Sequence, residues 1–165
     1  MTIAIIYASK TGNTQKVAEA IFTSLPYEKV IAKTSGDIDI TTFDIILIGY
    51  WCYRGFMDPL SLALVKKIQG KKVGAFGTAG VYPDSPAGVK CRNRIKEIIS
   101  QNNIFIGDFL CQGKIPEERT LKRMMLPKND SHYLDEEGIK RHLESRKHPN
   151  EVDLKQAQNY FLEVI

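Results

Sequence analysis

Short apolar runs alternate with amphipathic stretches along this chain, and that alternation constrains the fold more than any other feature. Residues 3–7 form a continuous, largely β-branched run that ends in small polar residues, as is typical of a strand buried on both faces. Apolar residues then recur at a 3.6-residue period, which predicts a helix over about 13–25 that Pro26 stops. The further strands that we expect lie near residues 28–32 and over 43–49, 72–78 and 104–111.

Helix start signals separate the later strands. Asp58-Pro59 and Ser85-Pro86 each combine an N-cap acceptor with proline at the first helical position. Asn150 provides a similar start for a last helix. The residues expected on the buried faces of these three helices are Leu60, Leu64 and Ile68, then Cys91, Ile95, Ile98 and Ile99, and finally Leu154, Ala157, Phe161 and Val164.

This order of elements predicts the α/β class. We expect a three-layer αβα sandwich in which a five-stranded parallel sheet of order 2-1-3-4-5 is covered on both faces. The 165 residues fit one domain, residues 1–165. Ligands of such sheets bind beyond the carboxyl ends of the strands, near the point where the strand order reverses. That rule selects the loops at 8–13, 50–58 and 78–85.

Composition narrows the function classes. The net charge of +4 comes from scattered residues of both signs, with no basic stripe of the kind that binds nucleic acid. Because the net charge is mildly positive, we expect the docking face of any protein partner to be neutral or acidic. No apolar run suits a membrane span or a signal peptide, so we expect a cytoplasmic protein that does not enter membranes. The three cysteines form no Cys-x-x-Cys pair and are expected to be reduced packing groups, and the scattered histidines indicate no metal site.

The loop Ser9-Lys10-Thr11-Gly12-Asn13-Thr14 joins the first strand to the first helix. Its hydroxyl and amide groups can donate hydrogen bonds, Gly12 permits close approach of the backbone, and the helix N-terminus attracts anions. The loop therefore predicts a cradle for a terminal phosphate, and the alternative is a polar turn that binds nothing. It is neither a Walker A motif nor a Gly-x-Gly-x-x-Gly motif, so a triphosphate or a dinucleotide is not favoured.

Ser-x-Thr-Gly-Asn-Thr after a first strand resembles the phosphate-loop signature of the flavodoxins, and residues 9–14 match every fixed position. The resemblance covers about residues 1–111 and the last helix. It implies the flavodoxin-like form of the αβα sandwich and FMN as cofactor. It also implies that the phosphate is held by the side chains of Ser9, Thr11, Asn13 and Thr14 and by the backbone amides of Lys10 and Gly12.

Two loops rich in aromatic residues follow the central strands, and in flavodoxins such loops flank the isoalloxazine ring. A flat, mostly apolar ring favours aromatic walls, so we expect stacking by Trp51 or Tyr53 and by Tyr82. The alternative for Trp51 is a place at the edge of the core. The cofactor-binding residues expected in these loops are Tyr50, Trp51, Cys52, Tyr53, Arg54, Gly55, Thr78, Ala79, Gly80, Tyr82 and Asp84.

Arg54 departs from the acidic pattern of many electron-carrier flavodoxins. Positive charge stabilises a reduced flavin anion. One hypothesis is therefore that Arg54 makes the potential of the flavin less negative, and the alternative is that Arg54 is a solvated side chain.

Residues 114–148 form an extra charged segment with nine Lys or Arg, seven Asp or Glu and all three histidines. Helices are expected over 135–147 and near 119–126, the latter with Met124 and Met125 packed inward. One interpretation is a surface excursion over a sheet edge. The other is a docking or lid element beside the flavin, since long insertions in compact domains are often functional.

Residues 109–115 and 148–154 are similar to a bacterial flavodoxin-like subgroup whose members partner anaerobic flavin reductases such as bilirubin reductase. The function that this implies is electron transfer between a reductase and an acceptor enzyme, with no catalytic residues of its own. One alternative is an FMN-dependent oxidoreductase that acts on a small molecule, like a quinone reductase or a protoporphyrinogen oxidase. Another is an interaction module without cofactor, against which the intact phosphate loop and Trp51 argue. The sequence does not indicate an oligomeric state.

Overall fold

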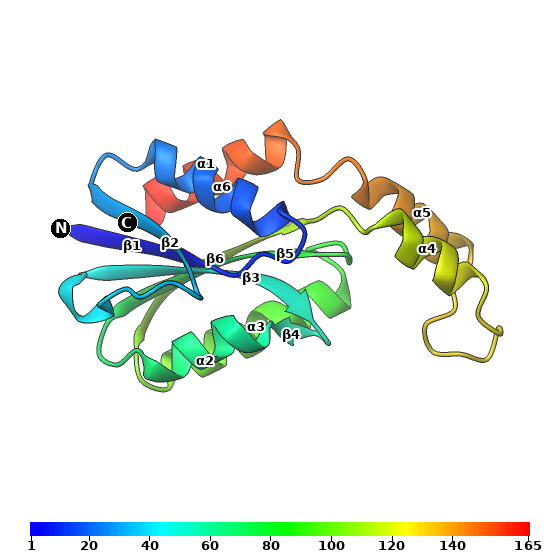
Figure 1. Cartoon of the computed structure of the whole chain (residues 1–165), viewed down its shortest axis with the longest axis horizontal. Helices are drawn as coiled ribbons and strands as arrows, with labels where there is room; N and C mark the ends of the chain where they lie inside the picture. The colour runs from blue at the N-terminus through cyan, green and yellow to red at the C-terminus, as the bar shows by residue number, and fades with distance from the viewer.

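A computed structural model describes all residues 1–165, and a parallel sheet forms its centre (Figure 1). The sheet order is β2-β1-β3-β5-β6, which is the predicted 2-1-3-4-5 order of five parallel strands. The parallel strands are β1 (Thr2–Tyr7), β2 (Glu28–Lys33), β3 (Ile45–Tyr53), β5 (Lys72–Ala79) and β6 (Ile104–Gln112). No helix is both long and apolar enough to cross a membrane.

The third strand is longer than the apolar run of the sequence predicts. Residues 50–53, expected in a loop, continue β3 and pair with an additional short antiparallel strand, β4 (Phe56–Met57). Arg54 and Gly55 make the turn with φ of 51° and 70°, as a two-residue hairpin requires. Arg94 fastens this hairpin to the body, because its Nη1 donates to the Gly55 carbonyl over 3.0 Å.

Two helices cover each face of the sheet, which confirms the three-layer prediction (Figure 1). On one face lie α1 (Asn13–Ser24) and α6 (Glu151–Val164), and on the other α2 (Pro59–Lys67) and α3 (Pro86–Ser100). A short 3-10 helix, η1 (Ile40–Thr42), precedes β3. Cys91, Ile95 and Ile99 of α3 are fully buried, as are Ala157 and Phe161 of α6.

The buried face of α2 differs from the predicted one. Ile68 is buried as predicted, whereas Leu60 is 59% exposed and Ser61 and Val65 are buried in its place. The cause is the N-cap, because Asp58 accepts from the Ser61 hydroxyl over 2.8 Å, and that hydroxyl also lies 3.1 Å from the Gly49 carbonyl of β3. These contacts turn Ser61 inward and rotate Leu60 towards solvent.

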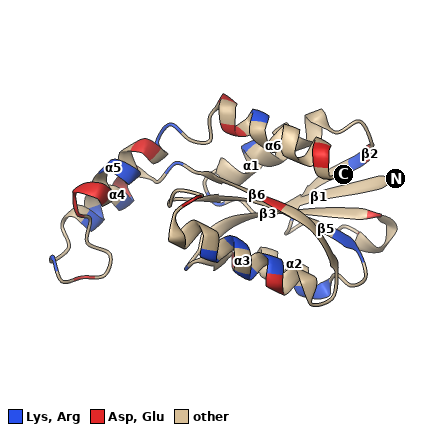
Figure 2. Ribbon diagram, turned by 180° about the vertical axis from the view of Figure 1, so that it is seen from behind, with Lys and Arg blue, Asp and Glu red and all other residues tan.

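The extra segment forms an arm that extends past the carboxyl ends of the strands (Figures 1 and 2). It contains α4 (Glu117–Met124) and α5 (Glu136–Ser145), and it does not lie over a sheet edge. Both helices were expected, but the inward packing of two methionines was wrong, since Met124 is 45% and Met125 87% exposed. The buried side of α4 is formed by Thr120, which packs against α5.

Candidate functional site

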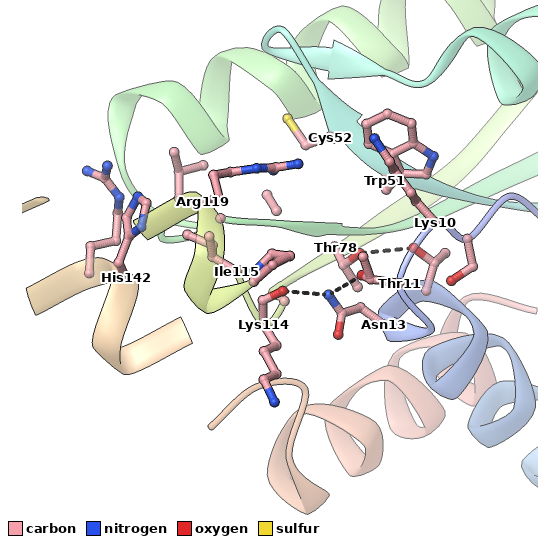
Figure 3. Close-up of a pocket in the computed structure, with 18 of the residues that line it drawn as sticks. Lys10, Thr11, Asn13, Trp51, Cys52, Thr78, Lys114, Ile115, Arg119 and His142 are labelled. Carbon is pink, nitrogen blue, oxygen red and sulfur yellow. Dashed lines mark hydrogen bonds between the residues drawn. The ribbon is translucent and has the colours of Figure 1, made fainter. Parts of the chain in front are cut away.

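A cavity of about 220 Å³ opens where the carboxyl ends of the strands meet the arm (Figure 3). All three loops that the topology selects contribute to it, as does the first part of the arm. The predicted site residues that line this pocket are Ser9, Lys10, Thr11, Asn13, Thr14, Trp51, Cys52, Arg54, Gly55, Thr78, Ala79 and Gly80.

The loop before α1 has a left-handed residue at its centre. Gly12 is the N-cap of α1 with φ of 90°, a conformation that favours glycine. The Ser9 hydroxyl oxygen accepts from the backbone amides of Gly12 and Gln15, at 3.1 and 3.3 Å. The first amides of a helix have no acceptor within it, and the Gly12 cap offers no side chain. Ser9 occupies two of the amides, and the loop offers the remaining ones to an anion, with Lys10 on its rim.

Two side chains of the loop are held by the protein itself. Asn13 Nδ2 donates to Thr11 Oγ1 over 3.2 Å and to the Lys114 carbonyl over 3.1 Å (Figure 3). The buried Thr14 hydroxyl lies 3.2 Å from the Tyr50 carbonyl and 2.9 Å from Thr78 Oγ1. These bonds tie the loop to β3, β5 and the arm, so Asn13 and Thr14 brace the cradle.

Trp51 forms one wall of the pocket. Lys10 Nζ lies 5.6 Å from the centroid of its ring, and Tyr53 packs edge-on against it at 5.4 Å. The backbone amide of Trp51 donates to Asp58 over 3.3 Å, which holds the hairpin against the start of α2. The pocket thus combines an anion cradle with an aromatic wall.

Five predicted site residues do not line the pocket: Gly12, Tyr50, Tyr53, Tyr82 and Asp84. Tyr50, predicted to bind the cofactor, lies in β3, and strand alternation points it into the core, where it packs over Gly77 so closely that a Cβ there would lie 2.2 Å from its ring. Tyr53 is 38% exposed beneath Arg54, whose guanidinium lies 5.2 Å from its ring. Tyr82 is 41% exposed in the turn before α3, and Asp84 lies in the same turn.

Cys52 is the one cysteine that lines the pocket, and its sulfur lies 3.6 Å from that of Cys91. The hydrogen bond from the Cys91 thiol lowers the pKa of Cys52. The same bond, together with burial, raises the pKa of Cys91, and burial raises the pKa of Cys111. The pocket therefore holds one thiol that is more acidic than usual.

The arm contributes residues that the sequence did not indicate as site residues: Lys114, Ile115, Pro116, Arg119, Arg123, Arg141 and His142. Gly113, which precedes the arm, and Val81 of the second loop also line the pocket. Close packing at Gly113 holds the start of the arm against the pocket. The Gly113 amide donates to the Ala79 carbonyl over 2.8 Å, and a Cβ on Gly113 would lie 2.9 Å from Asn13 Nδ2. One signal was available, because arginines at 119 and 123 stand four apart and share a helix face.

His142 lines the arm side of the pocket and is fully buried. Its Nδ1 lies 2.9 Å from the Thr120 hydroxyl, whereas Nε2 has no partner. Burial, and then the charges of Arg141, Arg123, Arg119 and Arg146, lower the pKa of His142 to about 4. The imidazole is therefore neutral near pH 7.

Comparison with known proteins places the chain among flavodoxins. Residues 4–162 match a family model described as a flavodoxin domain. The flavodoxin-like domain-containing protein BilS of Clostridioides difficile is 32% identical over 166 residues, which cover 97% of this chain and 94% of that protein. The oxidised Flavodoxin 2 of Bacillus cereus superposes with a TM-score of 0.63 at 18% identity, over 99% of this chain and 97% of the other. A flavoprotein of Lactobacillus acidophilus in complex with FMN superposes with a TM-score of 0.54 at 17% identity, over 66% and 91% of the two chains.

Proposed function

The chain belongs to the flavodoxin family, and on that premise we propose that it binds FMN in the pocket and carries electrons between a reductase and an acceptor enzyme. One observation carries the proposal: the amide cradle before α1 and the aromatic ring of Trp51 line the same cavity. FMN, when bound, supplies a ring that is reversibly reduced.

The phosphate end of the site is supplied by the loop at residues 9–14. The amides at the start of α1 donate to the phosphate, helped by the helix dipole. Ser9 and Thr11 supply hydroxyl groups on the same side, and Lys10 adds a positive charge. Asn13 and Thr14 keep the loop in place through their bonds to Lys114, Tyr50 and Thr78.

The ring end of the site lies between the hairpin and the second loop. Trp51 offers an aromatic face, and Thr78, Ala79 and Gly80 offer backbone groups at the end of β5. Glycine at position 80 lets Ile115 pack against this loop, because a Cβ there would lie 2.8 Å from the Ile115 side chain. An electron carrier needs no further acid, base or nucleophile in this arrangement.

A second candidate function is oxidation or reduction of a small molecule by the bound flavin. The arm favours it, since Ile115, Arg119 and His142 line the same cavity as Trp51. Turnover of a soluble quinone with a chemical or enzymatic reductant by the isolated protein would support this candidate. Transfer only to a protein acceptor would support the carrier.

The test of FMN binding is an absorption spectrum recorded after FMN is added and the excess is removed by gel filtration. We expect a retained chromophore with bands shifted from those of free FMN. The variant Thr11→Val should weaken FMN affinity about tenfold, because a charge-assisted hydrogen bond is lost. Thr23→Val, which changes another exposed threonine at the far end of α1, should leave the affinity unchanged. A colourless eluate from folded wild-type protein would overturn the proposal.

A further inference from the structure

The wall of the pocket carries an unbalanced positive charge. Lys10, Arg54, Lys114, Arg119, Arg123 and Arg141 line it, and no Asp or Glu does. Ion pairs of the arm lie elsewhere, between Arg146 and Glu117, Lys140 and Glu137, and Lys147 and Glu144. Figure 2 shows that both arm helices carry acidic residues, so the absence of carboxylates from the pocket wall is local.

Three of these cations come together on the arm side without a partner of opposite charge. Arg119 and Arg123 lie on α4, Arg141 lies on α5, and none of them forms an ion pair. Burial and the charges of Arg119 and Arg141 lower the pKa of Arg123. Like charges held close together and partly shielded from water oppose folding, and a bound anion removes that cost.

Two buried polar atoms at the same place also have no partner. They are Nε2 of His142 and Nε of Arg141. Buried polar atoms are rarely left unpaired in native proteins. The Thr120 hydroxyl holds the His142 ring through Nδ1. When that hydroxyl is the donor, the neutral ring carries its proton on Nε2, which is then an N–H donor with no acceptor in the chain.

We propose that Arg119, Arg123, Arg141 and His142 form a second anion-binding site in the pocket, for a small organic molecule that carries carboxylate or phosphate groups. Guanidinium groups match the two oxygens of such groups with paired hydrogen bonds. Ile115, Val81 and Pro116 line the same cavity and add apolar surface, which favours an organic ligand over a bare inorganic ion.

This site is separate from the phosphate cradle. Figure 3 shows Arg119 and His142 on the arm side and Thr11 and Asn13 on the opposite side, with Lys114 and Ile115 between them. A ligand held by the arginines is therefore adjacent to the ring position rather than on the phosphate loop. The site goes beyond the proposed function and does not require FMN to be bound.

The test is calorimetric titration of the full-length protein with citrate and, separately, with inorganic pyrophosphate, each with and without saturating FMN. We expect at least one of the two anions to bind in both conditions, and the stronger one identifies the ligand chemistry as carboxylate or phosphate. Arg119→Gln with Arg123→Gln should weaken that binding about tenfold or more. Lys122→Gln with Lys140→Gln removes the same charge from two exposed positions outside the pocket, one on α4 and one on α5, and should change it less than about twofold.

A second readout locates the anion. The Nε2–H and ring carbon resonances of His142 should shift with citrate or pyrophosphate at the concentrations that saturate the calorimetric signal. Those of the exposed His132 should not. Circular dichroism and the Tm of each variant show that loss of binding is not loss of fold.

Three results would overturn the proposal. The first is that neither anion binds to the wild type. The second is that both double variants weaken binding equally. The third is that citrate competes with FMN and the Arg119/Arg123 variant loses FMN binding as well. The last result would assign the arginines to the cofactor site. Failure of FMN binding itself is seen separately in the absorption spectrum, and anion binding without FMN remains measurable in that case.

Discussion

The sulfur atoms of Cys52 and Cys91 lie 3.6 Å apart, where the end of β3 meets α3. The pair divides into one thiol on the pocket side and one buried thiol that is hydrogen-bonded to it. A thiol with a lowered pKa that is also accessible is the reactive one. The pair therefore places the more reactive of its two thiols in the wall of the pocket.

Limited alkylation should modify Cys52 first. With one equivalent of iodoacetamide at about pH 8, a value near the ordinary thiol pKa, we expect peptide mass spectrometry to find the label on Cys52. Cys91 and Cys111 should stay unlabelled because both are buried and have raised pKa values. Cys52→Ser should abolish fast labelling and Cys111→Ser should not. Fast labelling of Cys111 in folded protein would contradict the assignment.

Tyr50→Phe should stabilise the protein. The Tyr50 hydroxyl is fully buried without a hydrogen-bond partner, and burial raises its pKa well above the ordinary value. Its removal leaves the ring on Gly77 and relieves the desolvation cost. We expect the free energy of unfolding in urea to rise by roughly 1 kcal/mol. A decrease of that size would instead show that the hydroxyl has a partner, such as a bound water.

Asp58→Ala should loosen the hairpin as well as α2. Asp58 accepts from the amides of Leu60 and Ser61, both at 3.0 Å, and from the amide of Trp51. We expect a loss of about 1–2 kcal/mol in unfolding free energy. Trp51 is the only tryptophan, so its fluorescence reports the hairpin directly. Asp58→Asn, which keeps an acceptor, should recover most of the loss, and an unchanged Trp51 emission in Asp58→Ala would contradict the link.

Arg54→Ala should make the flavin harder to reduce. Arg54 lines the pocket, and its positive charge favours the reduced, anionic ring. A charge at the pocket rim contributes on the order of 1 kcal/mol, so the two-electron midpoint should become more negative by about 20 mV. Redox titration of the FMN-loaded protein measures this. Arg146→Ala is the control, because Arg146 pairs with Glu117 outside the pocket. Equal midpoints for wild type and Arg54→Ala would remove Arg54 from this role.

Acid should destabilise the protein through His142. An unfolded histidine binds a proton below about pH 6.5, whereas folded His142 has a pKa of about 4. Between these values the unfolded state binds more protons, so stability falls as pH falls. Urea unfolding from pH 7 to pH 4.5 should show this slope in the wild type. His142→Asn should flatten it and His132→Asn should not. An identical pH dependence in all three proteins would show that His142 is not the cause.

Features that depend on neighbouring residues follow the sequence prediction, whereas features that depend on residues distant in the chain do not. Asp58, Ser85 and Asn150 cap helices as predicted because a cap depends on neighbouring residues only. Tyr50 and Leu60 lie elsewhere than predicted because the facing of a side chain depends on partners distant in the chain. The extension of β3 depends on pairing with β4, and the inward turn of Ser61 depends on the Gly49 carbonyl.

The linear pattern of residues determined the strand order and indicated that the loop at residues 9–14 and Trp51 belong to one pocket, because strand and helix periodicity, capping and hydroxyl-rich turns depend on adjacent positions. It did not determine that Arg141 and His142 reach the same cavity as Ser9, since this requires the arm that extends past the carboxyl ends of the strands to pack beside the loop before α1. Nor did it pair Cys52 with Cys91. Such contacts depend on how helices and strands pack in three dimensions, and spacing along the chain carries no record of that packing.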